Sequence, residues 1–143
     1  MDLKDLTPTS ETLEVKIVHP TTQEPFLNDD KSQMVIEVYA PHTKKYKAAI
    51  YKQASTRIKV SSMDEIDFET LDTASVEFLA AITKSWDITY DGKKPKLTEA
   101  KAKEVYDQIF WLKAQVEEAI SKFEVFTKNW SVSYLLMLNT SLN

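Results

Sequence analysis

The chain has 143 residues, of which 28% are charged and 43% hydrophobic, and its formal net charge at pH 7 is -4. These values are typical of a single globular domain and exclude an intrinsically disordered or membrane-embedded protein. Cysteine is absent, which excludes disulfides and thiolate chemistry and fits a reducing cytoplasm. Gly92 is the only glycine, so a glycine-rich phosphate-binding loop is excluded as well.

The amino-terminal part of the chain predicts two strands. Residues 1–11 are rich in Thr, Ser and Asp and predict a flexible leader. Apolar and charged residues then alternate over residues 13–18, which is the period of a half-buried strand. A second β-branched run covers residues 34–39 and stops before Pro41. The polar segment between the runs predicts a long-looped antiparallel pair, which needs helices to cover it.

Two helices are expected after these strands. Residues 43–60 contain neither Pro nor Gly and predict a basic amphipathic helix with a buried face made of Tyr46, Ala49, Ile50, Ala54 and Ile58. A second helix is expected to begin at Ser62, which has capping-box spacing to Glu65, and to end near Trp86. Its predicted apolar face comprises Ile66, Leu71, Ala74, Phe78, Leu79 and Ile82. Asp91 and Gly92 then mark a turn.

A heptad-like stripe follows Thr98, which we expect to cap the next helix. Its members are Val105, Ile109, Leu112, Val116, Ala119, Phe123 and Phe126. Their alternating spacing of four and three predicts one long helix, or two helices with a bend near Phe110 and Trp111. The stripe either packs on the core of its own domain or forms a seam with another chain.

These elements predict a helix-dominated α+β fold, in which a short N-terminal antiparallel strand pair packs against three to four helices. We expect one domain over residues 12–128 and an apolar C-terminal tail over residues 129–143. The tail is uncharged and β-prone, so its exposure to water would favour aggregation. It is therefore expected to be covered by its own domain, by a partner or by a second copy.

Charge is segregated in the middle of the chain. Residues 42–60 carry six basic residues and no acid, whereas residues 64–77 carry six acids and no base. We expect these neighbouring segments to neutralise each other at the surface. The alternative is a patch for a nucleic acid or an acidic partner, and the chain lacks the overall basicity of a nucleic-acid-binding protein.

No pattern in the sequence predicts catalysis. His19 and His42 are the only histidines, and each lies beside a proline in a predicted loop, so no histidine pair has metal-ligand spacing. A nucleophile elbow requires glycines that the chain does not have. The prediction is therefore a protein that is not an enzyme and that needs no cofactor or metal.

Several phrases of the sequence resemble tail assembly chaperones of long-tailed, siphophage-type bacteriophages. The carboxyl half of that family is similar to residues 82–86 (ITKSW), 90–98 (YDGKKPKLT), 105–106 (VY) and 111–116 (WLKAQV). Its strand and loop phrases are similar to residues 18–22 (VHPTT) and 39–46 (YAPHTKKY). The order of these phrases over residues 12–128 is more specific than any one of them.

The resemblance implies a chaperone of the infected host's cytoplasm that is absent from the mature virion. Such a protein binds the phage tape measure protein, keeps it soluble and leads tail-tube protein onto it. We also expect self-association, and neither nucleic-acid nor membrane binding. Because aromatic residues dominate binding hot spots, the candidate contacts are Trp111, Trp130, Tyr134, Leu135 and Leu138.

Two other functions fit the same residues. A structural virion component, such as a tail-tube or baseplate subunit, would remain in finished particles. A host-directed binding module would use the basic stretch from Lys44 to Lys59, and its binding would depend strongly on salt.

Overall fold

The computed structural model describes residues 2–3, 10–62, 65 and 67–123. Its elements in chain order are β1 (Thr12–Lys16), β2 (Val35–Tyr39), α1 (Lys44–Ser61), α2 (Phe68–Ile82), β3 (Thr83–Asp87) and α3 (Glu99–Gln108), followed by a helix over residues 110–123. The prediction of a helix-dominated α+β fold is confirmed. The predicted strand pair is part of a three-stranded antiparallel sheet.

The third strand is the main departure from the expected fold. Helix α2 ends at Ile82 instead of near Trp86, and the chain continues directly as β3, which pairs with β2. The Thr83 hydroxyl donates to the Leu79 carbonyl at 2.7 Å, so it satisfies a carbonyl at the end of α2. On its other side, the Thr83 hydroxyl lies 2.8 Å from the Tyr106 hydroxyl. Residues 83–87 form a strand instead of a further turn of α2, because β2 would otherwise have no partner on the side away from β1.

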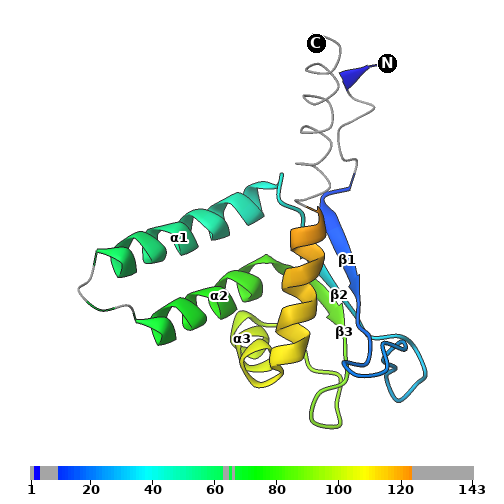
Figure 1. Ribbon diagram of the computed structural model, residues 1–143. Helices are drawn as coiled ribbons and strands as arrows, with labels where there is room; N and C mark the ends of the chain where they lie inside the picture. The colour runs from blue at the N-terminus through cyan, green and yellow to red at the C-terminus, as the bar shows by residue number, and fades with distance from the viewer. Residues whose placement is uncertain (1, 4–9, 63–64, 66, 124–143) are drawn as a thin grey trace, which may run out of the picture.

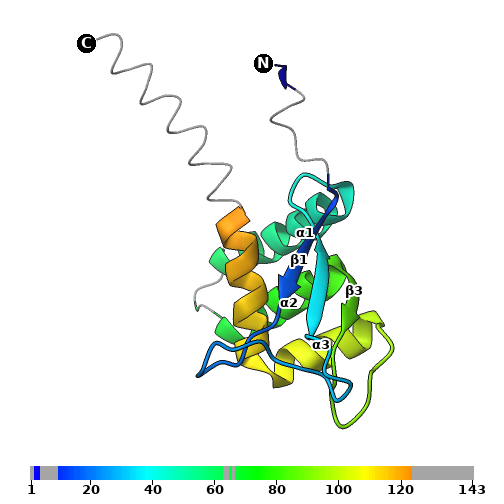
Figure 2. The same cartoon turned by 90° about the vertical axis from the view of Figure 1, so that its right-hand side faces the viewer.

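The core lies on one face of the sheet, whose strand order is β1-β2-β3. Val15 is paired with Ile36, and Leu13 with Val38, so their side chains share one face. Helices α2, α3 and 110–123 cover that face (Figure 1), and their buried residues belong to the same hydrophobic cluster. Strands β1 and β2 lie in front of the helices in Figure 2. Polar residues such as Glu14 and Lys16 occupy the other face.

Helix α1 begins after its cap Thr43, as the sequence predicts, but its buried face is different. Tyr46, Gln53 and Val60 are buried, whereas Ala54 and Ile58 of the expected face are exposed. With 3.6 residues per turn, each step of four residues rotates about 40° further around the helix, so the row from Tyr46 to Ile58 drifts off the core. Residues seven apart stay on one face of a helix, and the row Tyr46, Gln53 and Val60 is the face that is actually buried.

The start of α2 also differs from the prediction. Ser62 does not begin a helix; its hydroxyl donates to the Lys59 carbonyl at the end of α1. Asp67 is the actual cap, and its carboxylate accepts from the Thr70 backbone N–H at 3.1 Å. The apolar face of α2 is as expected for Ala74, Leu79 and Ile82, while Ile66 lies outside the described residues.

The heptad-like stripe faces the core of its own domain. Helix α3 ends at Gln108, Ile109 leaves helical geometry (φ -109°, ψ 78°), and the next helix starts at residue 110. The two-helix alternative with a bend is therefore the correct one. Val105, Leu112 and Val116 are buried in the hydrophobic cluster, while Phe126 lies outside the described residues.

Helices α1 and α2 run side by side as a hairpin that extends away from the sheet (Figure 1). Both helices lie between β2 and β3 in the chain. The two ends of the hairpin are held together where Val38 of β2 pairs with Thr83 of β3. In the part of the chain that the structure describes, no helix has the length and apolarity to cross a membrane.

Candidate functional site

The outer face of α1 is the most distinctive surface of the described residues. The six basic side chains of α1 are all exposed: Lys44, Lys45, Lys47, Lys52, Arg57 and Lys59; Arg57 also lines a hollow with Val60 and Leu71. Over residues 10–62, 65 and 67–123, none of them has a carboxylate within 4.0 Å. No ion pair therefore joins α1 to the acidic segment among these residues, and their mutual neutralisation at the surface stays a prediction.

The acidic side of the hairpin has other partners. Asp72 of α2 lies 3.8 Å from Lys113 of helix 110–123, and Asp67 is used as a helix cap. Lys52 of α1 and Glu77 of α2 line a common hollow between the two helices, together with Glu99 and apolar side chains. Neighbouring helices of opposite charge thus present separate basic and acidic surfaces.

Apolar side chains lie among the cations of α1. Tyr51 is 67% exposed and Ile58 is 69% exposed, and both project from the face opposite to Tyr46, Gln53 and Val60. Near the open end of the hairpin, Phe68 of α2 is 74% exposed. Exposed aromatic and aliphatic side chains beside flexible cations are characteristic of protein-binding surfaces.

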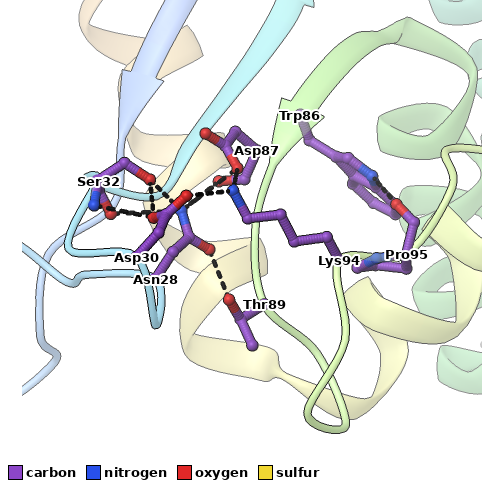
Figure 3. Close-up of polar contacts among 8 residues, drawn as sticks. All are labelled: Asn28, Asp30, Ser32, Trp86, Asp87, Thr89, Lys94 and Pro95. Atoms are coloured by element: carbon purple, nitrogen blue, oxygen red, sulfur yellow. Dashed lines mark hydrogen bonds and ion pairs between the residues drawn. The ribbon is translucent and has the colours of Figure 1, made fainter.

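A second cluster of chemically capable residues joins the β1–β2 loop to the segment after β3 (Figure 3). The Lys94 ammonium lies 2.9 Å from an Asp30 carboxylate oxygen and 3.0 Å from Asp87 Oδ1. Asn28 is 4% exposed, accepts from the Thr89 hydroxyl at 2.6 Å and donates to the carbonyl of Asp87 at 3.3 Å. The polar side chains of this cluster therefore satisfy one another's hydrogen bonds and charges.

This cluster holds two loops together. Trp86 extends the same junction, because its Nε1 donates to the Pro95 carbonyl at 2.9 Å. Trp86 is half-buried and structural, as the sequence indicated, although it lies in a strand and does not close a helix. Lys94 occupies the space between the two carboxylates, and no group of three or more His, Asp or Glu residues in the described part of the chain could hold a metal.

The carboxyl of Asp30 provides a pH test of this junction. Its bonds with Lys94, followed by those with Ser32, hold the pKa of Asp30 well below its usual range. A depressed pKa stabilises the folded state above about pH 4, the ordinary value for Asp, and this contribution is lost as the pH falls through the folded pKa. We therefore expect Asp30→Asn to weaken the protein at pH 7 and to flatten its loss of stability below pH 4, measured by urea unfolding.

The control is Asp29→Asn, because Asp29 is an exposed neighbour with no ion pair among the described residues. Equal pH profiles for the two variants would show that the Asp30–Lys94 contact contributes nothing to folding.

Trp111 is the only predicted contact residue within the described part of the chain. It is half-buried in helix 110–123, and its ring packs against Phe26 with centroids 5.6 Å apart. Phe26 in turn stacks on His19 at 5.9 Å. Trp111 therefore anchors the loop after β1, and the preceding residue, Phe110, is 77% exposed.

The other predicted contacts, Trp130, Tyr134, Leu135 and Leu138, lie outside the described residues. Sequence reasoning missed Tyr51 altogether and assigned Ile58 to the core. The signal that could have found them is their position five residues after Tyr46 and Gln53 of the buried row, which places each about 140° around the helix from that row.

Comparison with protein-family models, curated proteins and solved structures found no match to this chain. The function is therefore inferred from the residues, their resemblance and the surface of the fold.

Proposed function

We propose that this chain is a tail assembly chaperone of a long-tailed bacteriophage, which binds the tape measure protein and keeps it soluble while tail-tube protein assembles around it. It acts in the cytoplasm of the infected host, associates with further copies of itself and leaves before the virion is complete. Its partner is specified by the ordered sequence phrases quoted above, and its mode of action by the surface of α1.

The observation that carries the proposal is the outer face of α1, where exposed Tyr51 and Ile58 lie among cations that have no ion pair with any described residue. An apolar stripe on a helix can cover an apolar stripe on another helix without a pocket. A tape measure protein is a long helical chain, so shielding it requires such a surface. Trp111 and the residues Trp130, Tyr134, Leu135 and Leu138 remain the additional predicted contacts.

The test is co-expression with the tape measure protein of the same phage, comparing the full chain with a chain that lacks residues 129–143. We expect the full chain to keep the tape measure protein soluble and to co-purify with it, because its apolar stripes are covered. Loss of both effects on truncation would locate part of the contact in the tail.

A small soluble protein of similar charge is the control for a general effect of co-expression. An insoluble tape measure protein and an empty co-purification would contradict the proposal. Finished particles separate the main alternative, since a tail-tube or baseplate subunit would remain in purified virions and a chaperone would be absent from them.

A further inference from the structure

Three rows of side chains, each at seven-residue spacing, run along the outer face of α1. Tyr51 and Ile58 form the first row, Ala48 and Ser55 the second, and Lys45, Lys52 and Lys59 the third. At about 100° per residue the rows follow one another around the helix in that order. All seven residues are exposed. The row of small residues, Ala48 and Ser55, thus lies between an apolar row and a basic row.

The dimensions of this surface suit another helix. Helix α1 has 18 residues, which is about 27 Å at 1.5 Å per residue. Helices pack with axes about 8–10 Å apart, and the closest approach requires small side chains at the contact. Ala48 and Ser55 meet that requirement.

The first turn of α1 is unfavourable for the isolated helix. Lys44 and Lys45 lie at the positive end of the helix dipole, where acids are preferred, and this turn contains no acid. Neither lysine has an ion pair in the described part of the chain. An anionic partner at this end would offset the repulsion between these lysines and the helix dipole.

We propose that the outer face of α1 docks an amphipathic helix of a partner protein, with the apolar side chains of that helix against Tyr51 and Ile58 and its acidic side chains against the lysines. This inference rests on the proposed function, in which the docked helix belongs to the tape measure protein.

The surroundings of α1 favour a helix over a nucleic acid. The exposed carboxylates of Glu69 and Asp72 lie on the adjacent α2. A polyanion following the hairpin would meet them and be repelled, while a helix about 10 Å wide fits on α1 alone. A second copy of this chain is the other possible source of acidic side chains, and the test separates it.

The charge variant is Lys44→Glu with Lys45→Glu, and its control is Lys93→Glu with Lys96→Glu, an equal charge change at two exposed lysines elsewhere. We expect the charge variant to retain roughly tenfold less tape measure protein than the control at physiological salt. Its thermal midpoint should equal or exceed that of the wild type, because acids in a first turn favour the helix dipole. A structural role for the lysines would instead lower the midpoint.

The apolar variant is Tyr51→Ala with Ile58→Ala, and its control is Leu27→Ala with Phe110→Ala, which removes two exposed apolar side chains outside the α1–α2 hairpin. We expect only the α1 variant to lose tape measure protein, again by about tenfold or more. If only the Leu27→Ala, Phe110→Ala variant lost tape measure protein, the contact would lie on that surface and the inference would be overturned.

A synthetic probe keeps the inference separate from the proposed function. Two helical peptides share a leucine stripe, one flanked by glutamates and the other by lysines, and their binding is followed by fluorescence anisotropy. We expect at least roughly tenfold tighter binding of the glutamate peptide, lost in the Lys44→Glu, Lys45→Glu variant and weakened by salt. A failed co-expression with this peptide result intact would contradict only the tape measure assignment.

Three results would overturn the inference itself. The two peptides could bind equally, the charge variant could behave as its control does, or the wild type could use Lys44 and Lys45 to hold nucleic acid or a second copy. Absorbance at 260 nm and light scattering of the purified wild type and charge variant detect the last of these.

Discussion

Tyr106→Ala is expected to lower the free energy of unfolding by about 3–5 kcal/mol, which is the cost of truncating a large aromatic side chain in a packed core. Tyr106 of α3 is fully buried, and it lies where α3 meets the junction between α2 and β3. Because natural domains have about 5–15 kcal/mol of stability in total, this variant should be largely unfolded at moderate temperature. Urea unfolding followed by circular dichroism measures the change.

Tyr106→Phe isolates the hydroxyl. The Thr83 hydroxyl already donates to the Leu79 carbonyl, so the Tyr106 hydroxyl must be the donor in its 2.8 Å contact with Thr83. Its removal leaves no buried donor without an acceptor, and the expected cost is about 1 kcal/mol. A Phe variant as unstable as the Ala variant would show that the hydrogen bond, not the ring, dominates this junction.

The same pair of proteins has a distinct alkaline signature. Burial raises the pKa of Tyr106 to about 12. A raised pKa means that the contribution to stability is complete below about pH 10, the ordinary value for Tyr, and is lost as the pH rises towards 12. Tyr106→Phe should therefore lose less stability than the wild type between pH 10 and pH 12.

Gln115→Leu is expected to cost about 2–3 kcal/mol. The side-chain amide of Gln115 donates to the Val18 carbonyl at 2.8 Å and accepts from the Val18 N–H at 3.1 Å. It thus substitutes for a neighbouring strand just beyond the end of β1, on the open edge of the sheet. Leucine would leave both backbone groups half-shielded from water without a partner, at about 1–3 kcal/mol for each fully buried group.

The matched control is Gln108→Leu, because Gln108 is exposed and its side chain makes no hydrogen bond in the described part of the chain. Hydrogen exchange at the Val18 amide provides a local measurement beside urea unfolding. Unchanged protection of Val18 in Gln115→Leu would mean that helix 110–123 docks on β1 through its apolar residues alone.

The parts of the fold that depend on local pattern could be predicted from the sequence. Alternation identified β1, a β-branched run identified β2, and Thr98 was recognised as a helix cap, because these signals lie within a few residues of one another. Strand β3 could not be predicted, since its pairing depends on an open edge of β2 far away in the chain. Gln115 was missed for the same reason: its partner is a distant backbone.

The candidate site was less predictable than the fold. The basic composition of α1 was visible, but whether its cations are paired depends on the acidic side chains that tertiary packing brings near. Ile58 was assigned to the core because small angular errors accumulate along a row of four-residue steps. Trp111 was identified as an aromatic anchor, and its neighbour Phe26 shows that part of its surface is already used within the domain.

The central position of β2 has a consequence for synthesis on the ribosome. The core-facing side chains of its residues Ile36 and Val38 are covered only after β3 and helix 110–123 have been synthesised. Ribosomes add about 5–20 residues per second, so the apolar face of the nascent strand pair stays uncovered for several seconds. Two strands alone are only marginally stable, and folding is therefore expected to occur late, in a single step near the end of translation.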